Sequence, residues 1–246
     1  MANTHHTAGG GWRNRSKVAL ACAVVSVTAL LPVACGLPGG EDADAAAPPA
    51  ASAAPKVDDA AAAKQALADF QAASAALDAA KVEASLSESS KTYYENLRKL
   101  ALTANKATLA KKRLVDQVTV LGLRAGVKPD VLRDGDVTQL IEATLKSQQG
   151  AGPGTDDLSK AEVAVSGDTA TVTDPELPDA ALQLVREDGA WKVDVRSVFD
   201  MVDGLLTQLS SMHSGGKTGF VEQTVAQQVG GAAKARKLWK PVGAGD

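Results

Sequence analysis

The sequence predicts an α+β fold in which helices come first, an antiparallel sheet follows and a helical tail ends the chain. Three observations predict it. Apolar residues recur at helical spacing from residue 57 onward. A Gly- and Pro-rich stretch, GAGPGTDD at 150–157, interrupts this pattern. Beyond it the apolar spacing changes to two, which is the period of a strand with one buried face.

The first two predicted helices have narrow apolar faces. In the helix that starts near Val57, Leu67, Phe70 and Leu77 share one face with many alanines. The second helix is predicted to start at Thr92, because Glu95 follows it at the spacing of a capping box. Its apolar stripe comprises Tyr94, Leu97, Ala101 and Ala104.

Two more helices are predicted before the break. The third runs from Leu114 to about Gly126, and Pro129 just beyond is a stop signal. Its apolar stripe comprises Leu114, Val118 and Leu121. The fourth begins after the N-cap residue Asp136, with Gln139 at the position that completes the cap.

Two hairpins follow. AEVAV and TATVT flank the turn SGD, and ALQLVRE and AWKVDV flank Asp-Gly, which is among the strongest short turn signals. In the last strand Trp191, Val193 and Val195 are expected to face the core against the helical stripes. The residues between them, Lys192, Asp194 and Arg196, are expected on the wetter face.

The end of the chain is predicted to be helical again. Ser197 to Leu209 has apolar residues at helical spacing, and HSGGKTG then interrupts the helix. The remainder is predicted to be a loosely docked helix or a frayed tail. Its basic residues, Lys217, Lys234, Arg236, Lys237 and Lys240, are expected to form a solvated surface.

The first 34 residues have the features of a secretory signal peptide. Residues 1–17 are polar and basic, and the apolar run 18–34 is short for a membrane span. Its end, LLPVACG, resembles a bacterial lipobox, in which a small residue precedes the modified cysteine. The resemblance implies that Cys35 takes a diacylglycerol, becomes the first residue after cleavage and receives a further acyl chain such as palmitate. An uncleaved signal anchor and an ordinary secreted protein are the alternatives.

The sequence thus divides into four parts: a signal peptide (1–34), a disordered tether (35–56), an α+β domain (57–198) and a helical tail (199–246). The tether is predicted because GLPGGEDADAAAPPASAAPKV has no apolar periodicity and cannot bury enough surface to offset its ordering entropy. The formal charge is −3 for the whole chain, and −6 from Cys35 onward because residues 1–34 carry three basic groups and no acidic one. This acidic balance argues against a nucleic-acid partner.

The segments YYENLRKLAL, VTVLGLRAGVKPDVL and ALQLVREDGAWKVDV together resemble bacterial domains of the nuclear transport factor 2-like superfamily. The resemblance covers roughly 60–198. It implies a cone in which helices pack in the concavity of a curved antiparallel sheet and leave a pocket at the wide end. Some members of this superfamily are isomerases, cyclases or dehydratases, whereas many only bind or assemble, so the fold alone does not assign a function.

Few residues are candidates for chemistry. Enzymes of the superfamily use Asp, His or Tyr in the cone. His213 lies in a Ser/Gly-rich break and is expected to be an inert surface residue. Tyr93 and Tyr94 are expected to pack, with one hydroxyl at the boundary. Asp116 and Arg124 are expected on a solvated helix face, with a polar pair inside the cone as the alternative, and Trp191 is expected in the core or as a pocket wall.

No motif indicates a cofactor or a metal. The stretch DVLRDGDV lacks the alternating oxygen ligands of a calcium loop, and no Cys/His set has zinc spacing. No phosphate-binding loop or nucleophile elbow is present. The sequence therefore predicts a lipid-anchored cell-envelope protein, held at a membrane outside the cytoplasm, that binds a small apolar ligand or an envelope protein, with no catalytic residue assigned. A pocket enzyme of the isomerase or hydratase kind is the alternative. A third hypothesis is a scaffold that docks through an apolar stripe at Val198, Met201, Leu205 and Leu209.

Overall fold

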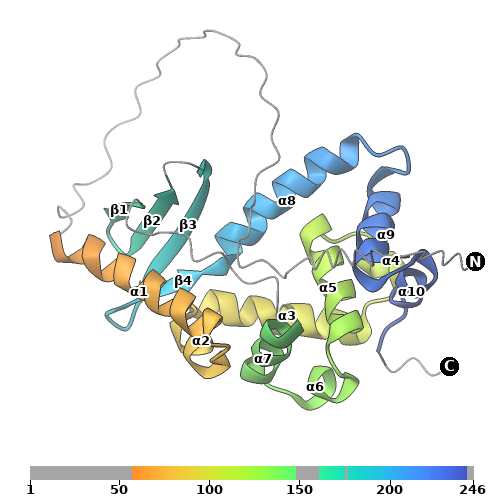
Figure 1. Ribbon diagram of the computed structural model, residues 1–246, viewed down its shortest axis with the longest axis horizontal. Coiled ribbons are helices and arrows are strands. Elements are labelled where there is room, and N and C mark those ends of the chain that lie inside the picture. Colours follow the sequence, from red (N-terminus) through yellow and green to blue (C-terminus); the bar gives the residue numbers. More distant parts are fainter. Residues whose placement is uncertain (1–56, 148–160, 175–176, 243–246) are drawn as a thin grey trace, which may run out of the picture.

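The computed structural model describes residues 57–147, 161–174 and 177–242, and it confirms the α+β class (Figure 1). The helices before the sheet are α1 (Val57–Ala75), α2 (Ala79–Ser85), α3 (Glu88–Thr103), α4 (Lys106–Leu109), α5 (Leu114–Gly126), α6 (Pro129–Asp134) and α7 (Val137–Ser147). The strands are β1 (Glu162–Ser166), β2 (Thr169–Asp174), β3 (Leu177–Glu187) and β4 (Ala190–Asp194). Helices α8 (Val195–Ser211), α9 (Gly216–Val229) and α10 (Ala232–Lys237) follow the sheet, so the helices precede the strands only in part.

The four strands form one open antiparallel sheet in the order β1-β2-β3-β4. Both predicted hairpin turns are present. Gly167 has a φ of 59°, and Asp188 and Gly189 have φ values of 51° and 79°, as a tight turn with two left-handed residues requires. The sheet lies at one end of the molecule with α1 along it, and α9 and α10 lie at the opposite end (Figure 1).

The second helix begins earlier than predicted. Helix α3 starts at Glu88, and the Ser87 hydroxyl caps it by accepting a hydrogen bond from the Ser90 amide at 3.2 Å. Thr92 and Glu95 therefore lie inside the helix and form no capping box. The serine at 87 is the stronger signal because it comes directly after the extended residue Leu86. At the fourth predicted helix the cap is correct: Asp136 and Gln139 each accept a hydrogen bond from the other's backbone amide.

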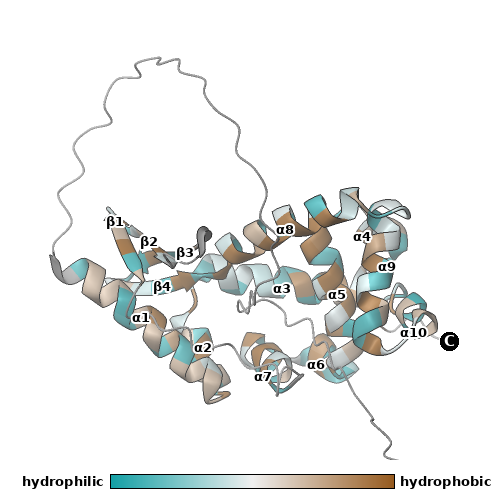
Figure 2. Ribbon diagram, turned by 45° about the horizontal axis from the view of Figure 1, so that its top comes forward, coloured by the Kyte–Doolittle hydropathy of each residue, from teal (hydrophilic) through white to brown (hydrophobic). Residues whose placement is uncertain are grey.

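Helix α5 is buried around most of its circumference rather than along one stripe. Leu121 and Val120, on different sides of it, are both fully buried. The reason is that α3, α7, α8 and α9 all pack against α5, and a helix surrounded in this way needs apolar residues on several faces. Figure 2 shows the hydrophobic stretches of α5 lying between α3 and the α8–α9 layer.

The buried face that the sequence predicts for the last strand extends along β4 only as far as Val193. Trp191 and Val193 are 8% and 0% exposed. Val195 is also buried, but it is the first residue of α8 and not a strand residue. The chain changes from strand to helix here because the Asp194 carboxylate accepts a hydrogen bond from the Arg196 amide at 3.0 Å and caps α8. Helix α8 continues without a break through residues 198 and 199, where the sequence analysis divides the α+β domain from the helical tail.

The start of α3 and the end of β4 are joined by a buried set of hydrogen bonds. The Ser87 amide donates to the Val193 carbonyl at 3.0 Å, and the Val195 amide donates to the Ser90 hydroxyl at 3.0 Å. Both serine residues are 0% exposed. This serine junction, defined by Ser87, Ser90, Val193 and Val195, connects segments more than one hundred residues apart in the sequence and satisfies amides at the start of two helices.

The C-terminal tail is firmly docked and not frayed. Val221 and Val225 of α9 are fully buried against the helical layer that contains α5. Ala235 of α10 and Trp239 just after it are 1% and 4% exposed. The aromatic and branched residues of the tail thus complete the core at the end of the molecule opposite the sheet.

We expect the Ser90→Ala substitution to lower the free energy of unfolding by about 1–3 kcal/mol, because it leaves the buried Val195 amide without an acceptor. Urea unfolding followed by circular dichroism measures this loss. Ser85→Ala is the matched control, since the Ser85 hydroxyl is exposed and bonds only within its own helix. Equal stabilities of the two variants would contradict a structural role for the junction.

Candidate functional site

The predicted lipidation site, Cys35, lies outside the described residues, as do the predicted signal peptide and tether. Among the described residues, no helix combines the length and the apolar character needed to cross a membrane. The same part of the chain holds no group of three or more His, Cys, Asp or Glu side chains placed to bind a metal ion. The candidate sites of the folded part are therefore polar clusters, grooves and exposed surfaces.

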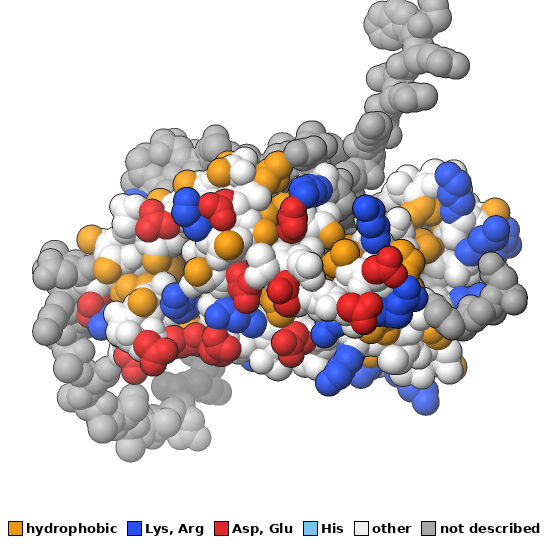
Figure 3. Space-filling model, turned by 90° about the horizontal axis from the view of Figure 1, so that it is seen from below, with side chains coloured by type: hydrophobic (Ala, Val, Ile, Leu, Met, Phe, Trp, Pro, Cys, Tyr) orange, Lys and Arg blue, Asp and Glu red, His pale blue; other side chains and the backbone are white. Residues whose placement is uncertain are grey.

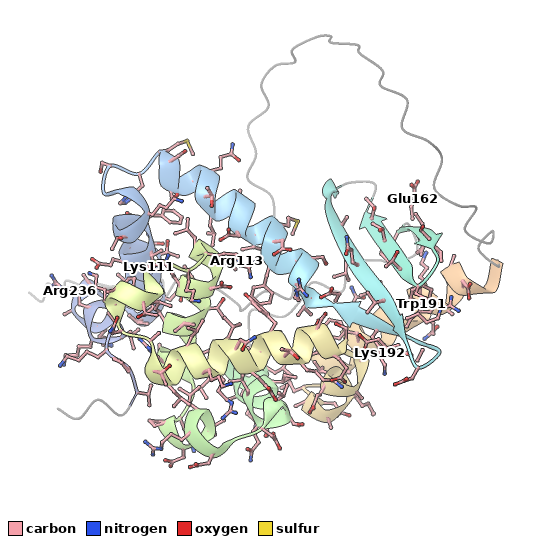
Figure 4. The ribbon with its side chains drawn as sticks, turned by 180° about the vertical axis from the view of Figure 1, so that it is seen from behind. Lys111, Arg113, Glu162, Trp191, Lys192 and Arg236 are labelled. Atoms are coloured by element: carbon pink, nitrogen blue, oxygen red, sulfur yellow. The ribbon has the colours of Figure 1, made fainter. Side chains whose placement is uncertain are left out.

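One polar cluster joins α3, α5 and α8, and it contains two residues named from the sequence. The Tyr93 hydroxyl donates a hydrogen bond to Asp116 Oδ1 at 2.5 Å. Arg113, just before α5, donates to both carboxylate oxygens of Asp116, from Nη2 at 3.0 Å and from Nε at 3.2 Å. Its Nη1 forms an ion pair with Asp200 of α8. Figure 4 shows Arg113 between these helices.

Burial and hydrogen bonding shift the pKa values of two groups in this cluster. The pKa of the Tyr93 hydroxyl is raised well above its usual range, chiefly by burial and then by the hydrogen bond to Asp116. The pKa of Arg113 is also raised, chiefly by its hydrogen bonds to Asp116. Tyr93 and Arg113 therefore keep their protons under ordinary conditions. The aromatic ring of Tyr93 packs edge-on against Phe199, with 4.8 Å between ring centroids.

Tyr93 and Asp116 also line a groove of about 620 Å³ between α3 and the start of α5. A catalytic base needs a proton acceptor that is free to meet a substrate. Both oxygens of Asp116 are already bonded to Arg113 or Tyr93, and the Tyr93 hydroxyl also accepts a hydrogen bond from Arg113 at 3.0 Å. The polar groups of the cluster thus satisfy one another's hydrogen bonds, and the cluster chiefly holds α3, α5 and α8 together.

Asp116 and Arg124 do not form the polar pair considered from the sequence, and neither lies on a solvated face. Asp116 is 8% exposed and pairs with Arg113. The guanidinium of Arg124 donates to four backbone carbonyls, those of Leu100, Ala101, Ala104 and Leu238. Three of these carbonyls lie at the C-terminal end of α3, where most helical carbonyls lack a partner within the helix. The Leu100 carbonyl also accepts a hydrogen bond from the Ala104 amide at 3.0 Å. Burial lowers the pKa of Arg124.

His213 has a structural role in the turn between α8 and α9. Its Nδ1 accepts a hydrogen bond from the Gly215 amide at 3.1 Å, and its Nε2 bonds to the Gln223 side chain. A Cβ at Gly215 would lie 3.0 Å from the imidazole ring, so glycine allows the close approach. Both ring nitrogens are therefore engaged in hydrogen bonds that join the turn to α9.

Trp191 is both a core residue and a groove wall. It is 8% exposed, and the Arg186 guanidinium lies 4.6 Å from the centre of its ring. With alanines of α1 and α2 it lines a groove of about 610 Å³. The neighbouring Lys192 is held at the groove by donating to the Ala84 carbonyl at 2.6 Å. Figure 4 shows Trp191 and Lys192 together at the sheet end of the molecule.

The exposed apolar surface of the described residues is concentrated on α8. Leu205, Leu209 and Met212 are 49%, 41% and 73% exposed, and Met201 is half-buried. Met201, Leu205 and Leu209 share one side of α8, and Met212, its C-cap residue, continues the row, so we call these four residues the α8 stripe. The sequence singled out this stripe but included Val198, which is 4% exposed because the helix is still packed near the sheet at that point. Met212 was missed because it follows the last predicted helical residue.

Asp116→Asn is expected to lower the free energy of unfolding by about 2–3 kcal/mol, since it removes charge-assisted hydrogen bonds from a buried position. Asp200→Asn is the matched control in the same network, and we expect a loss below about 1 kcal/mol because its side chain is 62% exposed. Urea unfolding measures both values. A larger loss for the Asp200 variant would contradict this ranking.

Comparison of the chain with family models, with curated proteins and with solved structures gave no match. No relative therefore supplies a function by similarity.

Proposed function

We propose that this protein is a lipid-anchored cell-envelope protein whose folded part is a protein-interaction module. The signal peptide features of residues 1–34 and the lipobox-like ending at Cys35 support the anchor and a location outside the cytoplasm. The packing of α1 on a four-stranded antiparallel sheet is compatible with a nuclear transport factor 2-like cone, which we retain as a proposal.

The observation that carries the interaction function is the α8 stripe. A folded protein normally buries leucine, yet two leucines of this helix and the methionine of its C-cap face solvent in one row. The rest of α8 has ordinary packing, because Phe199 and Leu206 on its other side are buried. The exposed row is therefore not a sign of a poorly packed helix, and it fits the seam of a second helix.

The occupant that the stripe fits best is a second copy of the same helix. If two α8 helices cross antiparallel, Leu205 of each copy lies opposite Leu209 of the other, and Met201 lies opposite Met212. This arrangement is self-complementary, as a two-fold interface requires. The stripe carries no charge of its own, so the two copies do not repel each other along this contact.

A pocket enzyme is less well supported. An isomerase or hydratase needs an acid and a base that reach a substrate, but Tyr93, Arg113 and Asp116 are committed to one another. The groove beside Trp191 gives room for a small apolar ligand, which remains the second form of binding that we consider. No catalytic residue is assigned.

The anchor is tested by the intact mass of the protein from a bacterial membrane fraction. We expect a chain that starts at Cys35 and carries added acyl mass. Cys35→Ser abolishes this modification, whereas Cys22→Ser, the matched control, leaves it unchanged. An unmodified chain that still contains residues 1–34 would overturn the anchor and favour a signal anchor instead.

Self-association through α8 is tested by sedimentation of the full chain carrying Cys35→Ser, so that no lipid contributes to assembly. We expect a dimer, and we expect L205S/L209S to raise its dissociation constant at least tenfold by removing two central leucines of the seam. Thr207→Ala, an exposed position on another side of α8, is the control. A monomeric parent chain, or a dimer unaffected by L205S/L209S, would overturn this pairing.

A further inference from the structure

Exposed cations gather at the end of the molecule opposite the sheet. They come from two segments, the turn after α4 and the helix α10 with its C-terminal extension. The residues are Lys111, Lys112, Lys234, Arg236, Lys237 and Lys240, all exposed, and we call them the basic end. Figure 4 shows Lys111 and Arg236 at the same end, and Figure 3 shows Lys and Arg side chains concentrated there, whereas acidic side chains dominate the opposite end.

The basic end has few carboxylates near it in the sequence. From Gly204 to Val242 the sequence has a single carboxylate, Glu222, and from Asn96 to Val115 it has none. Glu222 is already paired with Lys106, with 2.6 Å between Nζ and Oε1. Within the described part of the chain, none of the six cations of the basic end forms an ion pair, whereas Lys81, Lys91 and Lys146 each do. The six cations of the basic end are therefore not paired with carboxylates of the described residues.

The two basic segments are held in a fixed relation. Lys106 of α4 lies 5.1 Å from the ring centre of Trp239, which directly precedes Lys240. Arg124 donates to the Leu238 carbonyl at 2.8 Å, and the buried Ala235 fixes α10 between its cations. The cations are consequently presented on a docked surface, so little ordering entropy is lost when a partner binds.

We propose that the basic end docks on an anionic lipid surface. Clustered Lys and Arg side chains are attracted to anionic headgroups with about 1 kcal/mol for each residue near the surface. A nucleic acid is disfavoured because Trp239, the aromatic residue among these cations, is buried and has no face for base stacking.

The membrane setting rests on the proposed anchor at Cys35. A tether of 21 residues, 36–56, reaches at most roughly 70 Å when extended, which permits a domain held at one end to place its other end on the same membrane. A lipid and a basic surface together anchor a protein more stably than a single chain alone. The basic end would thus orient the domain as well as hold it.

The test uses the full chain carrying Cys35→Ser, so that the result does not depend on the lipid. Binding is measured by co-sedimentation with vesicles of phosphatidylcholine alone, or with 30% phosphatidylglycerol added, at low and high salt. K234Q/R236Q/K237Q removes three charges from the basic end. K81Q/K128Q/K146Q is the matched control, with three exposed lysines elsewhere on the fold.

We expect the parent and the control to bind the anionic vesicles more tightly than the neutral ones, and high salt to remove the difference. We expect K234Q/R236Q/K237Q to weaken the anionic binding about a hundredfold, from three residues at about 1 kcal/mol each. Equal loss in the two triple variants, or no preference for anionic vesicles, would overturn the proposal. Salt-sensitive binding of soluble polyphosphate without any preference for anionic vesicles would also overturn it, in favour of a soluble polymer.

Discussion

The serine junction is the contact that joins the helices before the sheet, at the start of α3, to the end of β4 and the start of α8. Ser87 and Ser90 supply hydrogen bonds to the backbone of Val193 and Val195, at the point where a strand ends and α8 begins. Buried amides at a helix start must find acceptors. Here the Ser87 amide donates to the Val193 carbonyl of β4, and the Val195 amide donates to the Ser90 hydroxyl of α3. Because α8 leaves the sheet at this point, the junction also sets the direction in which the α8 stripe is presented.

Two half-buried arginines connect elements of the helical part in a similar way, through hydrogen bonds between distant segments. Arg113 brings α3, α5 and α8 together through Tyr93, Asp116 and Asp200. Arg124 joins the end of α3 to the residue after α10 by donating to backbone carbonyls only. Removing one partner from such a site leaves a buried polar group unsatisfied, which costs more than the bond itself contributes. We therefore assign these arginines a structural role. The proposed functional surfaces, the α8 stripe and the basic end, do not include them.

The outer surface divides the proposed tasks between separate regions. The α8 stripe is apolar and one helix wide, which suits a protein partner, whereas the basic end is charged and suits a lipid surface. Both surfaces belong to the C-terminal tail or to the helices that it packs against. Val221 and Val225 dock this tail on the helical core, so a segment that resembles an appendage in the sequence positions both candidate contacts.

The sequence by itself determined the α+β class, the two hairpin turns, the cap at Asp136 and the limits of α5, because each depends on neighbours within a few residues. It also singled out Tyr93, Asp116 and Arg124, but it could not pair them. Only the tertiary structure decided that Asp116 meets Arg113 and Tyr93, that Arg124 meets carbonyls of α3, and that Lys111 lies at the same end as Arg236. Local propensity fixes where an element starts and ends, whereas such long-range partners are set by how the elements pack, which no short stretch of sequence encodes.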